Sequence, residues 1–405
     1  MHRARLILPV LFCTAFSDVG IAQYFNRAVF LGREEEGIRR DFNQNAEYFL
    51  NRFSYLQPPW RRSDLNRFGP GMDYAVGSVT SREFTVEARF QYRQPLNELV
   101  AIHFNMLQSE NQDTRYTRTA AEFEFTLTDD IALFLMGEGV ATKGEDDLSL
   151  GFYLGNRQDN GLRFSTTLVD AVGSKLVDQS YSKRPIGLML SGWTGRPGQS
   201  QLGFELASQL PLELDEIDLG RTFELERHIG SVTSQLVLHP RDRIVTELEI
   251  EYTEKERTPL DPLDPELESL RRNYLAVTSE WWHGEADGSQ VSVGVQYRHK
   301  NEDGYRPNDP SETLRAKRSE WLGFVRSKIP LRDEWSFEPS LYAGHVDLTE
   351  RVGTDRNEKY NGFQGKAGVA LLYEFTENAE ILLNVMMELD RSKFGGGSIQ
   401  FVTYF

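Results

Sequence analysis

The stretch VTELEIEYTE, residues 245–254, places a glutamate at every second position. Its two alternating sets are Glu247, Glu249 and Glu251 on one side, and Leu248, Ile250 and Tyr252 on the other. Successive side chains of a β-strand point to opposite faces, whereas a helix would mix the two sets around its circumference. The stretch therefore predicts a strand with one charged face and one apolar face.

The same period of two continues from about residue 72 to the end of the chain. It is clear in FTVEARFQY (84–92), AEFEFTLT (121–128) and VSVGVQYRHK (291–300). A soluble sandwich also alternates, but its strands usually have about 5–6 residues. Many stretches here run to ten residues or more, which suits a strand that crosses a membrane at a tilt. The sequence therefore predicts an all-β protein, an antiparallel transmembrane β-barrel over residues 72–405.

The connections between the alternating stretches predict the number of strands. Short turns, such as HPRD at 239–242, alternate with longer loops, such as ERTPLDPLDPELES at 256–269. Antiparallel membrane barrels have short turns on the periplasmic side and longer loops outside. The segment DYAVGSVT, from Asp73, supplies a first strand and makes the count even. We expect eighteen strands, with sixteen as the alternative.

The region before the barrel has two parts. Residues 1–22 combine Arg3 and Arg5, a short apolar run and a small-residue site ending at Ala22, which predicts a secretory signal peptide. Residues 23–71 form an N-terminal periplasmic or plug segment. Its apolar residues between Glu34 and Leu56 have helical spacing, which predicts a short amphipathic helix. That helix could cap the barrel mouth, plug the lumen or dock to a periplasmic export partner.

The last residues, SIQFVTYF, alternate apolar side chains and end on Phe405. This ending resembles the C-terminal signal of Gram-negative outer-membrane barrel proteins, which the barrel-assembly machinery of that family reads. Thr403 departs from the resemblance, because the family usually has an aromatic residue there. The resemblance implies an outer-membrane location with a lipid-facing wall, and it makes Phe405 an assembly signal. The chain is also similar to the eighteen-stranded barrels that secrete exopolysaccharide, although the two share no motif.

The alternation also predicts which side chains line the lumen. Glutamates spaced by two residues would repel in a dry interior, so we expect water or basic neighbours beside them. Trp193 is a candidate for stacking on sugars, whereas Trp281, Trp282, Trp321 and Trp335 are typical of an interfacial girdle. The expected lumen residues are Glu87, Arg89, Glu122, Glu124, Arg163, Trp193, Glu205, Glu247, Glu249, Glu251, Arg298, Lys300, Glu338, Lys366 and Glu388.

Composition and motifs narrow the functional classes. The formal net charge of −16 does not favour nucleic acid as a partner. The sequence has no G-x-S-x-G or H-E-x-x-H motif, and its histidines are scattered. We therefore expect that the protein has no enzymatic activity, no metal site and no cofactor. A barrel hydrolase is the least favoured of the functional hypotheses.

The expected function is an outer-membrane channel that passes polar solutes, either by diffusion or as the outer exit of an export system. An interior of mixed charge in an acidic chain favours neutral or cationic solutes. The alternative is a closed barrel that acts as a surface receptor, adhesin or assembly scaffold.

Overall fold

The computed structural model describes the chain from residue 71 onward, apart from several connections. The predicted signal peptide, the predicted N-terminal helix and Phe405 lie outside the described residues. Those residues contain no helix long and apolar enough to cross a membrane. The described ranges are 71–79, 84–110, 115–140, 145–156, 160–173, 179–183, 186–195, 199–216, 221–259, 268–285, 288–305, 314–332, 334–352, 356–376, 379–389 and 392–404.

The described residues form one sheet of 19 strands, and every pairing between them is antiparallel. The first nine strands are β1 (Gly71–Val79), β2 (Phe84–Pro95), β3 (Val100–Glu110), β4 (Arg115–Thr128), β5 (Ile131–Val140), β6 (Glu145–Asn156), β7 (Asn160–Gly173), β8 (Gln179–Lys183) and β9 (Ile186–Thr194). The others are β10 (Gln201–Glu216), β11 (Arg221–His239), β12 (Asp242–Pro259), β13 (Glu268–Gly284), β14 (Gln290–Tyr305), β15 (Leu314–Arg332), β16 (Trp335–Val352), β17 (Arg356–Thr376), β18 (Ala379–Glu388) and β19 (Lys393–Tyr404).

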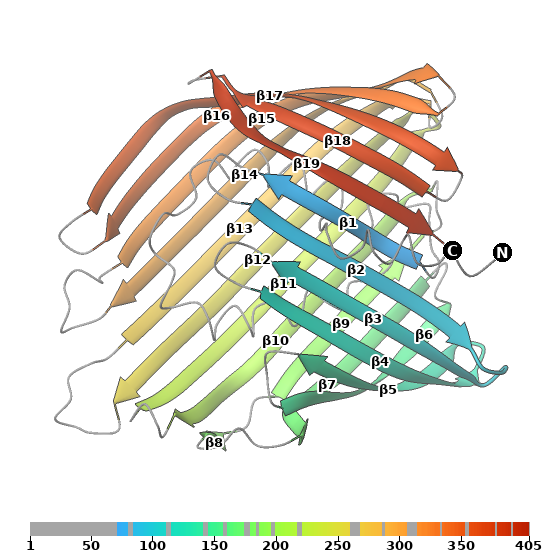
Figure 1. Cartoon of the computed structure of the whole chain (residues 1–405), viewed down its shortest axis with the longest axis vertical. Helices are drawn as coiled ribbons and strands as arrows, with labels where there is room; N and C mark the ends of the chain where they lie inside the picture. Colours follow the sequence, from blue (N-terminus) through green and yellow to red (C-terminus); the bar gives the residue numbers. More distant parts are fainter. Residues whose placement is uncertain are drawn as a thin grey trace, which may run out of the picture.

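The sheet closes on itself. Each strand pairs with the next in the chain, except that β7 pairs with β9 and the short β8 pairs with β10. The last strand, β19, pairs with β1, and β1 pairs with β2, so the ring has no free edge. Figure 1 shows β1 between β19 and β2. Without β8, the 19 described strands leave a ring of eighteen, which confirms the predicted fold and strand number.

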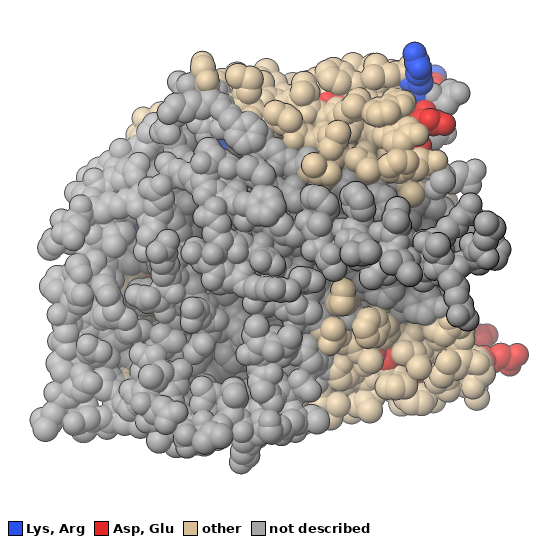
Figure 2. All heavy atoms as spheres, viewed as in Figure 1, with Lys and Arg blue, Asp and Glu red and all other residues tan. Residues whose placement is uncertain are grey.

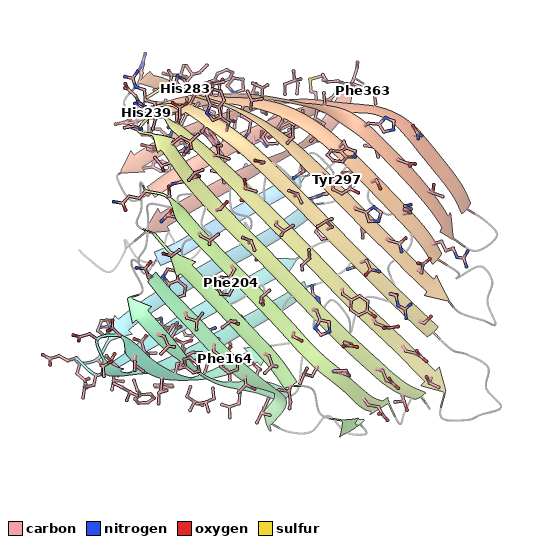
Figure 3. All side chains as sticks on the ribbon, turned by 180° about the vertical axis from the view of Figure 1, so that it is seen from behind. Phe164, Phe204, His239, His283, Tyr297 and Phe363 are labelled. Atoms are coloured by element: carbon pink, nitrogen blue, oxygen red, sulfur yellow. The ribbon has the colours of Figure 1, made fainter. Side chains whose placement is uncertain are left out.

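The short turns gather at one end of the barrel. The described connection between β11 and β12 is two residues long, and that between β2 and β3 is four. Neighbouring short turns touch each other, since Gly284 donates a backbone hydrogen bond to Arg241 and Glu374 donates one to Glu334, both at 2.9 Å. His239 and His283 mark this end of the wall (Figure 3).

The strands differ in length around the ring. The strands β11 to β17 have 16 to 21 residues, whereas β5 has 10. About 9–11 tilted residues cross a membrane. The long strands therefore extend the wall well beyond that span, and they do so on one side of the barrel (Figure 1).

Candidate functional site on the inner wall

The outward face of the barrel is apolar and exposed. Val369 on β17 and Val385 on β18 are 47% and 51% exposed, and exposed large apolar side chains occupy the same face of β3 to β7, β10 to β16 and β19. In Figure 2 the described residues on the visible wall are mostly uncharged, and the coloured charged side chains lie toward its edge. A water-soluble protein rarely exposes so large an apolar surface. It is the outer surface of a membrane-spanning barrel of the outer-membrane type.

Aromatic side chains border this apolar belt on both sides. Trp321 and Tyr297 contact each other on the long-loop side, with ring centroids 4.4 Å apart. Trp335 stacks on Tyr373 on the short-turn side, also at 4.4 Å. On β17, Phe363 and Tyr373 share the outward face ten residues apart, which matches the length of a membrane-crossing strand.

One member of the expected girdle is on the wrong face. Trp281 points outward, as predicted, and is 41% exposed. Trp282 is the next residue of the strand and therefore points inward. Its ring lies 5.2 Å from the Arg243 guanidinium and 5.1 Å from that of Arg326. The girdle prediction for Trp282 was wrong because adjacent residues of a strand cannot share a face.

The predicted lumen residues occupy one face of the described wall, opposite the apolar belt. The buried members are Glu122, Glu124, Arg163, Glu205 and Lys366, and the half-buried ones are Trp193, Glu247, Glu249, Glu251, Arg298, Lys300 and Glu338. Glu87 and Arg89 lie on β2 and Glu388 on β18, with side chains outside the described part of the chain. No contact in the described part identifies these residues as a solute path, so that role stays a prediction.

Strand register brings five charged residues into one line across the inner wall. We call this line the charged row. Along it, charged side chains on β7, β10, β12 and β14 alternate with small side chains on the strands between them, and β15 adds a final carboxylate. In order, the row is Arg163, Ser191, Glu205, Ser231, Glu249, Ala276, Arg298 and Glu320.

The small residues of the charged row give the charged ones room. Neighbouring strands lie about 4.7–4.9 Å apart, so charged residues on alternate strands are separated by roughly twice that distance. The hydroxyl oxygens of Ser191 and Ser231 are buried, and neither has a hydrogen-bond partner among the described residues. Buried hydroxyls are normally paired with protein or with ordered water. The row therefore fits a hydrated inner wall.

The glutamates of β12 meet basic neighbours, as the repeated carboxylates require. Glu251 Oε1 lies 3.4 Å from Arg227 Nη2 and 4.0 Å from Arg272 Nη1. It also accepts a hydrogen bond of 2.9 Å from Thr253 Oγ1. The sequence did not single out Arg227 or Arg272, because only the register shows which strands flank β12 at this level.

A second group of charges lies on β4, β6 and β7. Arg163 Nη2 donates to Glu122 Oε2 at 2.9 Å, and Tyr153 Oη donates to Glu122 Oε1 at 2.9 Å. Arg163 Nε in turn donates to Tyr153 Oη at 3.0 Å. The guanidinium stacks 4.2 Å from the centre of the Phe134 ring. These contacts fix Arg163 against the wall, so it narrows the interior little.

His103 joins this group from β3. Its Nε2 lies 2.5 Å from Glu124 Oε2, and it pairs directly with Glu122 across the strands. Ligand-type atoms of His103, Glu122 and Glu124 all lie within 4.8 Å of one another. A divalent cation could use such a set, although Glu122 already accepts hydrogen bonds from Arg163 and Tyr153. No metal site was predicted from the sequence, in which His103 is one of several scattered histidines.

A third group contains a buried ion pair in which both carboxylate oxygens are engaged. Both oxygens of Glu280 on β13 contact Arg326 on β15, with Nε donating to Oε1 at 2.8 Å. Ser292 Oγ on the intervening β14 donates to the same Oε1 at 2.5 Å. Ser292 is fully buried, and its small side chain lets Arg326 reach across β14. This pair was missed because its partners lie 46 residues apart.

The interior is less polar than the alternation predicted. One buried apolar cluster on the inner wall contains Ala120, Phe134 and Met136. A larger one extends over β15 to β18: Leu322, Phe324, Tyr342, Ala370, Leu372, Leu382 and Met386. In IALFLMGEGV (β5) both alternating sets are mainly apolar, and in AEILLNVMME (β18) the inward set includes Leu382 and Met386 among its polar residues. The charged groups are therefore separated by apolar sections of wall.

Comparisons with known proteins give fold-level likenesses only. No family model matches the chain, and no curated protein matches its sequence. Among solved structures, it is similar to a bacterial polysaccharide outer membrane secretin (TM-score 0.41, 9% identity, covering 82% of this chain and 97% of that one). It is also similar to OccK10 (OpdN) of Pseudomonas aeruginosa, with a TM-score of 0.41 and 12% identity, over 82% of this chain and 97% of that one. A loop-deletion mutant of OmpT, an outer membrane protein of Vibrio cholerae, matches with a TM-score of 0.38 and 11% identity, over 84% of this chain and 100% of that one. At TM-scores below 0.5, these likenesses leave the function to be argued from the chain's own residues.

Proposed function

We propose that this chain is an outer-membrane channel for polar solutes. The observation that carries the proposal is the charged row, which places side chains of both signs along the inner wall of a closed ring of eighteen strands. Rings of about 16–18 strands leave an aqueous passage unless something fills them. The apolar belt and its aromatic borders supply the matching contact with membrane lipid.

The charges favour neutral or cationic solutes. On β12 three glutamates, Glu247, Glu249 and Glu251, face the interior within one stretch of strand. Arg163 and Arg326 are each paired with a buried carboxylate, which reduces their attraction for a passing anion. A pore lined by carboxylates selects cations. Passive diffusion of small solutes and the outer exit of an export system both fit such a wall.

The role of the segment 23–71 would distinguish a diffusion pore from the outer exit of an export system. We propose that it plugs the lumen or docks to a periplasmic export partner if the channel serves export. In a diffusion pore, we propose that the segment only caps the periplasmic mouth. We also propose that the barrel-assembly machinery recognises Phe405 as an assembly signal and inserts the chain into the outer membrane.

Single-channel conductance tests the proposal. The refolded chain beginning at residue 23 is placed in a planar bilayer, and a second form begins at residue 71. Steady current from the longer form indicates a diffusion pore, and current from the shorter form alone indicates a plugged export channel. Silence from both forms, in protein shown to be folded by its heat-dependent gel mobility, would refute the channel and favour a closed receptor, adhesin or scaffold.

A further inference from the structure

Three metal-ligating side chains, those of His103, Glu122 and Glu124, gather on the inner wall of β3 and β4. We call them the His103 group. One ligand-type atom from each residue lies within 4.8 Å of the other two, and the described part of the chain contains no second set of three such residues as compact as this one. Both carboxylates are 3% exposed, whereas the His103 side chain is 18% exposed. The group is therefore buried at its carboxylates and reachable at its imidazole.

Strand register brings these side chains together from two neighbouring strands. His103 lies directly opposite Glu122, and the buried Ala101 lies directly opposite Glu124. Diagonal neighbours on paired strands are about 7–8 Å apart, which long side chains can span. The small side chain of Ala101 leaves room for the imidazole to reach along this diagonal, so that His103 Nε2 lies 2.5 Å from Glu124 Oε2. The imidazole thus meets both carboxylates at one place.

The contacts of Glu122 on its other side orient it as a ligand. Arg163 and Tyr153 donate to different oxygens of Glu122, each at 2.9 Å. They stand on β7 and β6, whereas His103 stands on β3, on the opposite side of β4. A carboxylate offers about four lone-pair sites, and a carboxylate that binds a metal ion is typically hydrogen-bonded as well. The two contacts therefore leave Glu122 able to bind a metal ion and hold it in position.

We propose that the His103 group binds a divalent transition-metal ion such as Zn²⁺. An imidazole nitrogen and carboxylate oxygens suit Zn²⁺, which binds them at about 2.0–2.2 Å, whereas Mg²⁺ and Ca²⁺ prefer oxygen ligands alone. Two ligands of a tetrahedral ion at those distances lie roughly 3.4 Å apart. His103 Nε2 and Glu124 Oε2 therefore separate by about 1 Å as the ion enters between them. Water from the interior completes the coordination.

Metal binding goes beyond the proposed channel and is measured without any conductance. Calorimetric titration of the refolded chain beginning at residue 23 with zinc chloride, in detergent micelles, gives the affinity and the stoichiometry. We expect one tightly bound Zn²⁺ ion per chain. Mg²⁺ in about 100-fold excess should not displace this ion, because Mg²⁺ does not favour an imidazole ligand. Displacement by equimolar Mg²⁺, or no tight Zn²⁺ binding by folded protein, would refute the site.

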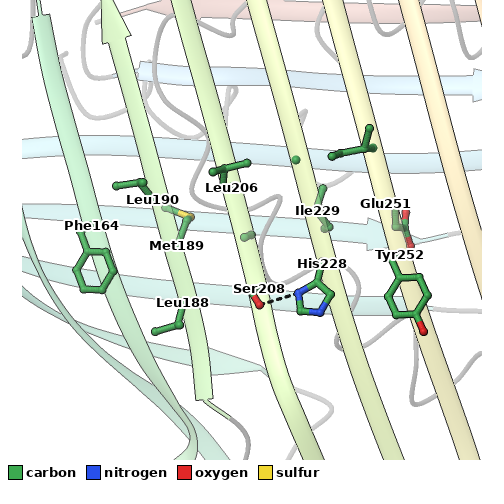
Figure 4. Close-up of a pocket in the computed structure, with 13 residues that line it drawn as sticks. Phe164, Leu188, Met189, Leu190, Leu206, Ser208, His228, Ile229, Glu251 and Tyr252 are labelled. Carbon is green, nitrogen blue, oxygen red and sulfur yellow. Dashed lines mark hydrogen bonds between the residues drawn. The ribbon is translucent and has the colours of Figure 1, made fainter.

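Matched histidine variants locate the ion. His103→Leu should weaken Zn²⁺ binding by at least about 100-fold, since it removes a direct ligand. Glu124→Gln serves as a second loss variant if His103→Leu does not fold. His228, on the lipid-facing side, lies 2.9 Å from a single glutamate (Figure 4), and His283 lies 2.9 Å from Asp242 at the short-turn end. His228→Leu and His283→Leu should leave the affinity unchanged. Loss of the tight ion in either of these controls, with retention in His103→Leu, would overturn the assignment.

The variant His103→Cys tests whether residue 103 binds the metal directly. Cys13 is the only cysteine of the chain and precedes residue 23, so this variant gives the refolded protein a single thiol. A thiolate bound to Co²⁺ produces a charge-transfer absorption band, which we expect in His103→Cys and not in His228→Cys. Tyr153→Phe removes the hydroxyl that orients Glu122 and should weaken Zn²⁺ binding by about tenfold. Folded His103→Cys without the band would show that residue 103 is not a ligand.

Discussion

At the scale of single residues, the stability of the inner wall depends on buried ion pairs, in which each charge is tolerated only because its partner is present. The clearest is Glu280 with Arg326, where Ser292 adds a third contact and both charged side chains are buried. Burying two charges costs desolvation energy that only their mutual contact offsets. Removing one partner leaves the other charge in a poorly hydrated place. The pair should therefore behave as a unit in mutagenesis.

We expect Arg326→Met alone to destabilise the folded barrel by about 3–5 kcal/mol. The double variant Glu280→Gln, Arg326→Met should cost much less, because no unpaired charge remains. Denaturant unfolding of the protein refolded in lipid vesicles measures both free energies. Arg241→Met is the matched control, since its pair with Glu285 is exposed and should contribute little. Additive costs for the two members of the buried pair would contradict this account.

At the scale of strands, most of the fold could be predicted from the sequence. A period of two fixes which residues share a face, so the placement of Glu247 to Glu251 opposite Ile250 needs only local information. Pairing across strands does not follow from that period. His103 beside Glu124, and Arg326 beside Glu280, depend on the register, which sequence alternation leaves open. In β5 the alternation itself is weak, and in β18 apolar Leu382 and Met386 stand among the polar residues of the inward set, so the apolar sections of the inner wall were not predicted.

The outward face of β17 gives a prediction that separates a membrane barrel from a soluble one. Val369 is exposed and lies between Phe363 and Tyr373. In a soluble barrel, Val369→Arg would place a charge in water at little cost. In a membrane, the same change should destabilise the fold by about 2–4 kcal/mol. Unfolding in lipid vesicles tests this, and Thr258→Arg is the control because Thr258 is exposed beyond the belt. Equal tolerance of the two substitutions would exclude the membrane belt.

At the scale of the whole molecule, one closed sheet separates two environments. Its eighteen-strand ring has no unpaired edge, so every strand contributes one face to the lipid and one to the interior. The long strands from β11 to β17 raise one side of the wall and carry the glutamates of β12. The carboxylates of the described strands are therefore divided between two faces with different consequences, as Glu251 and Glu254 on β12 show. In the channel proposed above, carboxylates on the inner face act on solutes in transit, whereas those on the outer face are placed to act on neighbouring lipid.

This division predicts that the ion selectivity of the channel changes when inward carboxylates are substituted, but not when outward ones are. The triple variant Glu247→Gln, Glu249→Gln, Glu251→Gln removes three inner carboxylates, and we expect the cation/anion permeability ratio to fall toward one. Asp303→Asn with Asp347→Asn removes two exposed carboxylates from the outward face and should leave the ratio unchanged. Reversal potentials across a salt gradient measure both ratios in the same bilayer. Equal effects would mean that overall charge governs selectivity, and an unchanged ratio in the triple variant would show that β12 does not line the conducting path. A fall confined to the inner variant would instead place the solute path along the glutamates of residues 245–254.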